Sequence, residues 1–216
     1  NLTEENIYVL DSPILTNTQF KKFKKFFSKK VRVIDCTFDI EGSLKERIGS
    51  IRKEAETAVR EGSTCLVLSD KNISNQKASI PSILTVGAVH SHLVKHGLRG
   101  YCSLNVECSD AMDTHSFAIL IGVGATTVNP YLAIDSIYQR FEKRLFGKSE
   151  FETCVNKFKK SIDSGLLKIM SKMGISVISS YRGGCNFEAV GLSRAIVSDY
   201  FPGMSSRISG IGIIGI

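Results

Sequence analysis

The stretch Val31-Arg-Val-Ile-Asp-Cys-Thr-Phe38 is rich in β-branched residues, which predicts a strand. From Leu44 to Val59, apolar residues recur at spacings of four, three, four and four, which predicts an amphipathic helix ending near Gly62. The apolar run at 64–69 then has the composition of a buried parallel strand. This strand–helix–strand order with short connections predicts a βαβ unit and therefore a parallel sheet.

The same order continues along the chain. A polar loop at 70–79 leads to a helix from Pro81 to about Gly97, and strands are predicted at 101–108 and 126–130. Residues 31–130 are therefore expected to form a core of successive βαβ units. The fold class is α/β, mainly a parallel sheet with flanking helices and a helix-rich C-terminal third.

The C-terminal region, 131–216, is expected to be mostly helical. One apolar face runs from Phe151 to Met173, and Gly174 supplies a stop. A fifth strand is predicted at 175–178, and an exit segment closes the chain. Because 208–216, after the last basic residue Arg207, is an uncharged stretch rich in Gly and Ile, the sequence indicates an excerpt from a longer protein.

Composition sets the broad class. The 216 residues are 43% hydrophobic and 23% charged, which fits one large globular domain and excludes wholesale disorder. No apolar run approaches the roughly 18 residues of a membrane helix. The first ten residues lack the basic start of a secretory signal, and the six cysteines show no CxxC pattern. We therefore expect a cytoplasmic protein with reduced thiols and no membrane partner.

The net charge of +7 is concentrated in one segment. Residues 20–32 hold seven basic side chains and no acid, and without them the basic and acidic residues are equal in number. Clustered lysines with aromatics are typical of a nucleic-acid or anionic-surface site. However, Phe20, Phe23 and Phe27 make one stripe of a helix with lysines opposite, so an ordinary amphipathic helix within an N-terminal segment, 1–30, is favoured.

Several candidate chemical groups have a simpler structural explanation. His92 and His96 share a helix face with His90 nearby, but a zinc site needs a third ligand that no sequence neighbour supplies. Cys102 and Cys108 fall on one apolar strand face, which favours core packing over iron–sulfur or redox chemistry.

Two further motifs are weak. Gly122-Val-Gly124 suggests a phosphate loop, but Thr127 stands where a dinucleotide motif needs its third glycine, so a tight turn is favoured. His115 beside Asp113 could form an oriented general base, yet no nucleophile is evident and a capped helix start explains both residues.

The loop 179–188 is the most suggestive stretch. It gathers Tyr181, Arg182, Asn186 and Glu188 around the flexible Gly183-Gly184, after a predicted strand end where α/β proteins bind ligands. An interdomain contact explains the same residues equally well.

Stretches along nearly the whole chain resemble one family, the large (α) subunit of glutamate synthase. They are Leu10-Asp-Ser-Pro-Ile-Leu15, Leu68-Ser-Asp70, Ile80-Pro-Ser82, Val86-Gly-Ala-Val-His90, His115-Ser-Phe-Ala118, the stretches 124–133 and 165–176, Ser180-Tyr-Arg-Gly-Gly184, and the stretches 186–192 and 206–212. The likeness is most specific from residue 113 onward.

The resemblance implies a central domain of an enzyme that hydrolyses glutamine in an amidotransferase domain and passes ammonia to an FMN barrel. There 2-oxoglutarate would be aminated and reduced to glutamate. FMN and an iron–sulfur cluster are expected in the full-length enzyme and none in this segment. The implied partners are the amidotransferase and FMN domains of the same polypeptide and a reductase small subunit, with no nucleic acid.

The resemblance therefore places no catalytic, cofactor-binding or metal-binding residue in this chain. It makes 1–216 part of a central, scaffolding domain of glutamate synthase. Six residues are the candidate interdomain contacts: Tyr181, Arg182, Asn186, Glu188, Ser206 and Arg207. Two alternatives remain at this stage, namely a stand-alone flavin-binding partial barrel and a nucleic-acid or anionic-surface binding module at the lysine-rich helix.

Overall fold

A four-stranded parallel sheet forms the centre of the molecule, in a computed structural model that describes residues 7–184 and 186–216. Its strands lie in the order β1 (Val31–Asp35), β3 (Cys65–Ser69), β5 (Ser103–Glu107) and β6 (Thr127–Asn129). The predicted α/β class with a parallel sheet is confirmed. The first six residues of the predicted 1–30 segment, and Cys185, lie outside the described residues.

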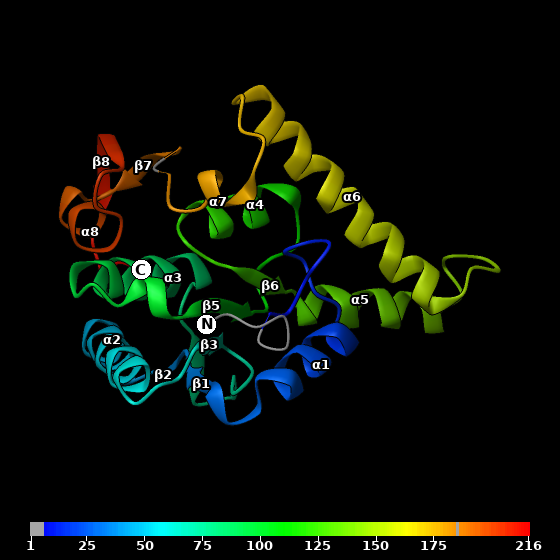
Figure 1. Ribbon diagram of the computed structural model, residues 1–216, viewed down its shortest axis with the longest axis horizontal. Helices are drawn as coiled ribbons and strands as arrows, with labels where there is room; N and C mark the ends of the chain where they lie inside the picture. Colours follow the sequence, from blue (N-terminus) through cyan, green and yellow to red (C-terminus); the bar gives the residue numbers. More distant parts are fainter. Residues whose placement is uncertain (1–6, 185) are drawn as a thin grey trace.

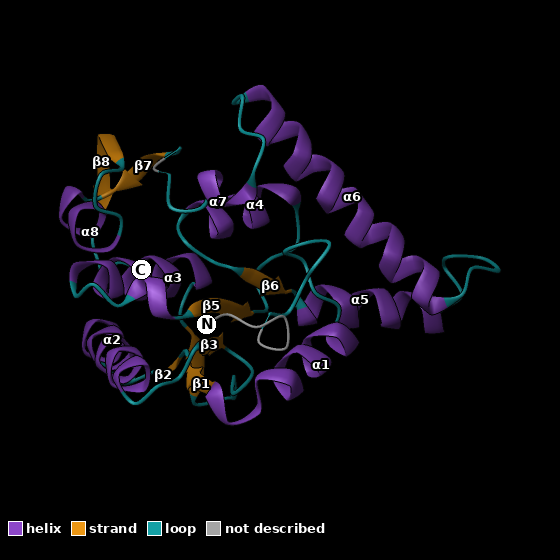
Figure 2. Cartoon of the chain, in the orientation of Figure 1, coloured by secondary structure: helices purple, strands orange, loops and turns teal. Residues whose placement is uncertain are grey.

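Helices cover both faces of this sheet (Figures 1 and 2). The crossovers contain α2 (Leu44–Arg60), α3 (Ser82–Lys95) and α4 (Thr114–Gly122), together with the short 3-10 helix η3 (Arg99–Tyr101). All five residues of β3 are buried. Leu66 and Leu68 belong to the core cluster under α2 and α3, whereas Cys65 and Val67 belong to a second cluster under the N-terminal helix. A strand buried on both faces needs an unbroken apolar run, which explains the sequence at 64–69.

The second cluster is formed by α1 (Asn17–Phe27), which is followed by the 3-10 helix η2 (Ser28–Lys30). Phe20 and Phe23 are buried, so the predicted amphipathic helix is confirmed. These two rings face the sheet and are not available to stack on bases. Ahead of the helix, the chain runs beside β6, where the Leu15 N–H donates to the Val128 carbonyl (2.9 Å). The N-terminal segment is thus joined to the edge of the sheet.

Two strand predictions were wrong in detail. The stretch 31–38 divides at Cys36 into β1 and β2 (Thr37–Asp39), because the Asp35 carboxylate accepts hydrogen bonds from the N–H and hydroxyl of Thr37 and turns the chain. Strand β2 pairs antiparallel with β4 (Lys77–Ser79), inside the predicted polar loop. The predicted fifth strand at 175–178 is instead a loop at 175–177 followed by a short helix, α7 (Ile178–Tyr181). The Ile175 N–H donates to the Met170 carbonyl and closes the preceding helix, with Gly174 in the left-handed region.

The C-terminal third is helix-rich, as predicted, but it also contains a small second sheet. Its helices are α5 (Tyr131–Glu142), α6 (Phe151–Lys172), α7 (Ile178–Tyr181) and α8 (Arg194–Tyr200). Strands β7 (Glu188–Leu192) and β8 (Ser205–Ile211) pair in parallel across α8, which is another βαβ unit that the sequence patterns did not reveal. Among the described helices, none has the length and apolar character needed to cross a membrane.

Candidate functional site

The carboxyl ends of β3 and β5 meet at one edge of the sheet, where open α/β folds bind ligands. Glu107, the last residue of β5, is buried and accepts a hydrogen bond from Ser69 (2.8 Å). Its other oxygen pairs with Lys24 of α1 (3.3 Å) and with Lys71 (2.9 Å). Burial opposes ionisation, but the hydrogen bonds and the two lysine charges outweigh it and hold the pKa of Glu107 below its ordinary value.

The neighbouring polar groups also bind partners within the chain. One oxygen of the buried Asp70 accepts from the backbone N–H (2.9 Å) and hydroxyl (2.6 Å) of Ser109. At the end of β6, the Asn129 amide donates to the Leu15 carbonyl (2.9 Å) and to the Asn17 side chain (3.0 Å). These side chains bind loops and α1 to the sheet, so their geometry indicates that they stabilise the fold at this edge.

His90 lies at the opposite end of the sheet, beside Arg99. The Arg99 guanidinium donates to His90 Nδ1 (3.1 Å) and to the carbonyls of Cys102 (2.6 Å) and Gly124 (2.8 Å). Burial, and then the charges of Arg99 and Arg182, lower the pKa of His90 to about 4. His90 is therefore neutral near pH 7 and acts as a hydrogen-bond acceptor that fixes the arginine.

The glycines at 122 and 124 make room for side chains. A Cβ at Gly122 would lie 2.2 Å from the Phe187 ring, and one at Gly124 would lie 2.3 Å from Nδ1 of His90. The Gly124 N–H already donates to the Ile121 carbonyl (3.0 Å), and its φ of +128° favours glycine. The favoured turn is confirmed, and this geometry does not fit a phosphate cradle.

Two other candidates have the structural roles that the sequence favoured. The Asp113 carboxylate caps α4 by accepting from the N–H and hydroxyl of Ser116 (both 2.8 Å), and His115 is exposed. Cys102 and Cys108 are buried in the core at either end of β5. The five residues of an extended strand lie between these two thiols, which places them roughly 20 Å apart, too far to bind one iron–sulfur cluster.

The loop 179–188 contains residues of two kinds. Tyr181 is fully buried, and its hydroxyl donates to the Ala118 carbonyl of α4 (3.0 Å). The Tyr181 ring therefore packs within its own chain, and its predicted interdomain contact stays a prediction. Asn186, which is partly buried, donates to the Tyr181 carbonyl (3.3 Å) and shapes the loop.

The remaining predicted contacts lie closer to the surface. Arg182 is half-buried, its Nε has no hydrogen-bond partner among the described residues, and burial and then Arg99 lower its pKa. The Ser206 hydroxyl is likewise buried without a partner in the described part of the chain. Glu188 and Arg207 form an exposed ion pair across β7 and β8 (3.5 Å). The structure thus brings Glu188, Ser206 and Arg207 together on β7 and β8. Arg182 instead lies near the charge of Arg99.

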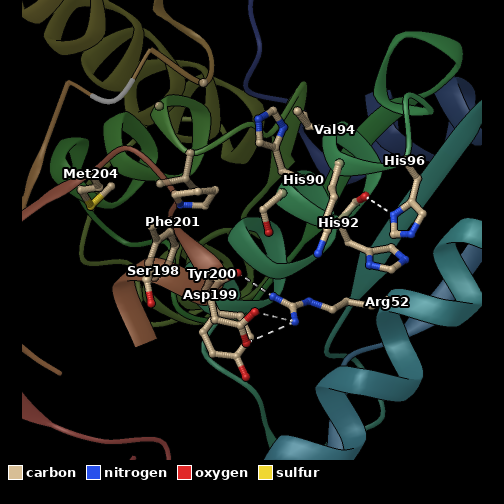
Figure 3. A pocket seen from close by; sticks show the side chains of 16 residues that line it. Arg52, His90, His92, Val94, His96, Ser198, Asp199, Tyr200, Phe201 and Met204 are labelled. Carbon is tan, nitrogen blue, oxygen red and sulfur yellow. Dashed lines mark hydrogen bonds and ion pairs between the residues drawn. The ribbon is translucent and has the colours of Figure 1, made fainter. Parts of the chain in front are cut away.

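A pocket of about 620 Å³ between α3 and α8 was missed by sequence reasoning. Arg52 of α2 joins the surrounding helices by donating to the Ala88 carbonyl (3.2 Å) and to the Asp199 carboxylate (3.1 Å), as Figure 3 shows for Arg52 and Asp199. A Cβ at Gly87 would lie 2.3 Å from the Phe201 ring. A glycine within a predicted helix is a sequence signal that another element packs closely there, but the sequence does not show which element it is.

The strands of the small C-terminal sheet lie at the upper left of Figure 1, and they carry exposed apolar side chains. Val190 and Ile208 are opposite one another on β7 and β8 and are 65% and 61% exposed. Ile211 and Ile214 are also exposed. Large aliphatic side chains that lie side by side on a surface are typical of contacts with another domain or protein.

Fold and site together define a parallel α/β domain with an internally bonded sheet and an apolar C-terminal face. The chain belongs to the glutamate synthase central domain family, whose model matches residues 1–193. It is 51% identical over 99% of its length to the glutamate synthase [NADPH] large chain of Azospirillum brasilense, and 41% identical over 94% to that of Bacillus subtilis. It spans only 14% and 13% of those two proteins.

Among solved structures, a complex of DHODH with ferulenol from Eimeria tenella is similar with a TM-score of 0.48 and 14% identity. The match covers 72% of this chain and 38% of that one.

Proposed function

We propose that this chain is the central scaffold of a glutamate synthase, holding a glutaminase domain and an FMN-containing synthase domain in register. The whole enzyme would convert glutamine, 2-oxoglutarate and reductant into two molecules of glutamate, in the cytoplasm. The chemical steps would take place on the flanking domains, with a reductase small subunit as a further partner. This chain would supply the geometry between them.

One observation carries the proposal: the exposed apolar face of β7 and β8. Burying Val190 and Ile208 against another domain would stabilise the contact by about 1.5 to 3 kcal/mol for each side chain. Arg182 Nε and Ser206 Oγ are buried without partners in the described part of the chain, so a local rearrangement on contact with a neighbouring domain would be needed to satisfy them. Glu188 and Arg207 would border the same contact.

The cofactors of the full enzyme, FMN and an iron–sulfur cluster, are proposed to lie outside this chain. The buried cysteines that flank β5 and the filled space at Gly122 and Gly124 support this division. Bound elsewhere in the polypeptide, the flavin would supply the redox chemistry.

A chimera tests the scaffold role directly. The matching segment of the Azospirillum brasilense large chain is replaced by this chain, and Ile208→Glu is introduced. We expect the variant to hydrolyse glutamine but to form less glutamate for each glutamine consumed, because a charge on the contact face separates the two domains.

Ile40→Glu is the matched control, since Ile40 is 59% exposed in the turn after β2 and the chemical change is identical. It should leave the ratio of glutamate formed to glutamine hydrolysed unchanged. Equal ratios in both variants and the unmodified chimera would show that the β7–β8 face is not an interdomain contact.

An absorption spectrum of the purified 216-residue chain separates the scaffold from a stand-alone flavoprotein. The scaffold proposal expects no flavin band at about 450 nm after incubation with FMN and removal of the excess. Stoichiometric FMN, released on denaturation, would show that the segment builds a cofactor site of its own.

A further inference from the structure

Two histidines of α3 and one glutamate of α2 converge beside the pocket. His92 lies one turn before His96, and their ring centroids are 4.2 Å apart, as Figure 3 shows for these two side chains. Glu56 reaches them from the adjacent helix, and the three ligand atoms all lie within 4.8 Å of one another. The third ligand that no sequence neighbour of the histidines supplies therefore comes from 36 residues before His92.

Hydrogen bonds orient the members of this cluster. His96 Nδ1 lies 2.8 Å from the His92 carbonyl, and a carbonyl only accepts, so Nδ1 carries the proton and Nε2 presents a lone pair. Arg60 binds the other Glu56 oxygen, Oε1 (2.9 Å), and leaves Oε2 toward the histidines. Metal-binding histidines and carboxylates are commonly held by such outer partners.

The distances suit a small divalent ion. Glu56 Oε2 lies 2.8 Å from His92 Nε2 and 3.9 Å from His96 Nε2. Ligand atoms of a tetrahedral zinc site are separated by roughly 3.3 Å, given metal–ligand bonds of about 2.0–2.1 Å. These two separations bracket this value, and the third, between the two Nε2 atoms, is within 4.8 Å, so small side-chain rotations would complete the geometry.

We propose that Glu56, His92 and His96 form a Zn²⁺ site that joins α2 to α3. The ligands are Oε2 of Glu56 and Nε2 of each histidine, and water takes the fourth position. His92 and His96 line the pocket between α3 and α8, so the fourth position is open to it. Binding displaces the proton that His92 shares with Glu56, and that proton goes to solvent. The site is independent of the scaffold role, because it uses none of the residues of the β7–β8 face.

The test is calorimetric titration of the metal-free chain with Zn²⁺. We expect one equivalent to bind and to raise the melting temperature. Glu56→Gln and His96→Asn should each weaken binding by at least about tenfold, because loss of an outer partner alone costs 10 to 100-fold. Co²⁺ should give the visible bands of four-coordinate cobalt in the unaltered chain, and these bands should disappear in both variants.

The matched control is His115→Asn, at an exposed histidine outside the cluster. It should bind Zn²⁺ as the unaltered chain does. Circular dichroism of each metal-free variant shows that lost binding does not reflect lost folding. Absence of stoichiometric binding by the folded chain would overturn the proposal, and so would a Zn²⁺ affinity in Glu56→Gln and His96→Asn equal to that of the unaltered chain.

Discussion

The central sheet and the small C-terminal sheet share parallel pairing but differ in completeness. Every residue of β3 is buried, and Glu107 at the end of β5 has partners for both oxygens. In β8, by contrast, Ile208 and Ile211 are exposed, and the Ser206 hydroxyl is buried without a partner in the described residues. The first sheet buries the apolar side chains of β3 and β6, although Oδ1 of Asn129 in β6 also has no partner among the described residues. The second sheet differs in leaving large apolar side chains exposed, which a neighbouring surface could cover. We infer that stability resides in the first and contact in the second.

The strongest test of this comparison removes the same side chain from each sheet. Ile34 of β1 is fully buried, and Ile34→Ala should lower the free energy of unfolding by about 2 to 5 kcal/mol through lost burial and a residual cavity. Ile208→Ala on β8 should change it by no more than about 0.5 kcal/mol. Urea denaturation of the isolated chain measures both values, and similar losses would contradict the division into core and contact surface.

The junction between the two regions depends on Gly87. A Cβ there would meet the Phe201 ring at 2.3 Å and the Tyr200 carbonyl at 2.8 Å. Gly87→Ala should therefore cost about 1 to 3 kcal/mol, because α8 must shift away from α3.

Gly49→Ala on α2 is the matched control, since nothing lies within 4 Å of its added Cβ. The better helix propensity of alanine should stabilise this variant by up to about 1 kcal/mol. Chemical denaturation compares the two, and a stabilising Gly87→Ala would contradict the close contact between α3 and α8.

The sequence predicts the central sheet well because its signals are local. The apolar run at 64–69 and the helical spacing from Leu44 to Val59 each arise within one element. Asp113 similarly caps α4 from within its own turn. The strand prediction at 175–178 was wrong because the residues after a helix can either begin a strand or close that helix. The hydrogen bond from the Ile175 N–H to the Met170 carbonyl closes the helix, and the local sequence pattern does not reveal it.

The features missed by the sequence analysis depend on distant residues. Arg52 and Asp199 meet across 147 positions, and Glu56 reaches His92 across 36. The tyrosine at 181 was predicted to be a contact because its loop is polar, but its ring fills the space beside α4. Local patterns identify such residues without identifying what each one touches.

A smaller effect is expected at Glu107, whose pKa is lower in the folded chain than its ordinary value of 4.5. Such a carboxylate adds stability above the unfolded pKa, and this contribution is lost as the pH falls through 4.5 toward the folded value. Glu107→Gln should lower stability by about 1 kcal/mol at pH 7, because Lys71 is partly solvent-screened. The variant should also lose less stability than the unaltered chain as the pH falls from 7 to 3.

Thermal melts from pH 7 to pH 3 would follow this dependence. Glu41→Gln, at an exposed carboxylate, is the control and should keep the shape of the unaltered chain's curve. A Glu107→Gln curve parallel to that of the unaltered chain would show that the ion pairs with Lys24 and Lys71 add nothing to the stability of the sheet edge.

The smallest effect on stability, and the most informative about contact, is expected at Arg182. Its Nε is buried without a partner in the described residues, and Arg99 repels its charge, so the isolated chain gains little from it. Arg182→Ala should change the free energy of unfolding by no more than about 0.5 kcal/mol.

In the chimeric glutamate synthase, the same change should lower glutamate formation, because an acidic or carbonyl group of the adjoining domain would lose its cation. If glutamate formation and stability were both unchanged, Arg182 would not be a contact. A loss above about 1 kcal/mol in the isolated chain would instead show that Arg182, like Tyr181, supports its own fold.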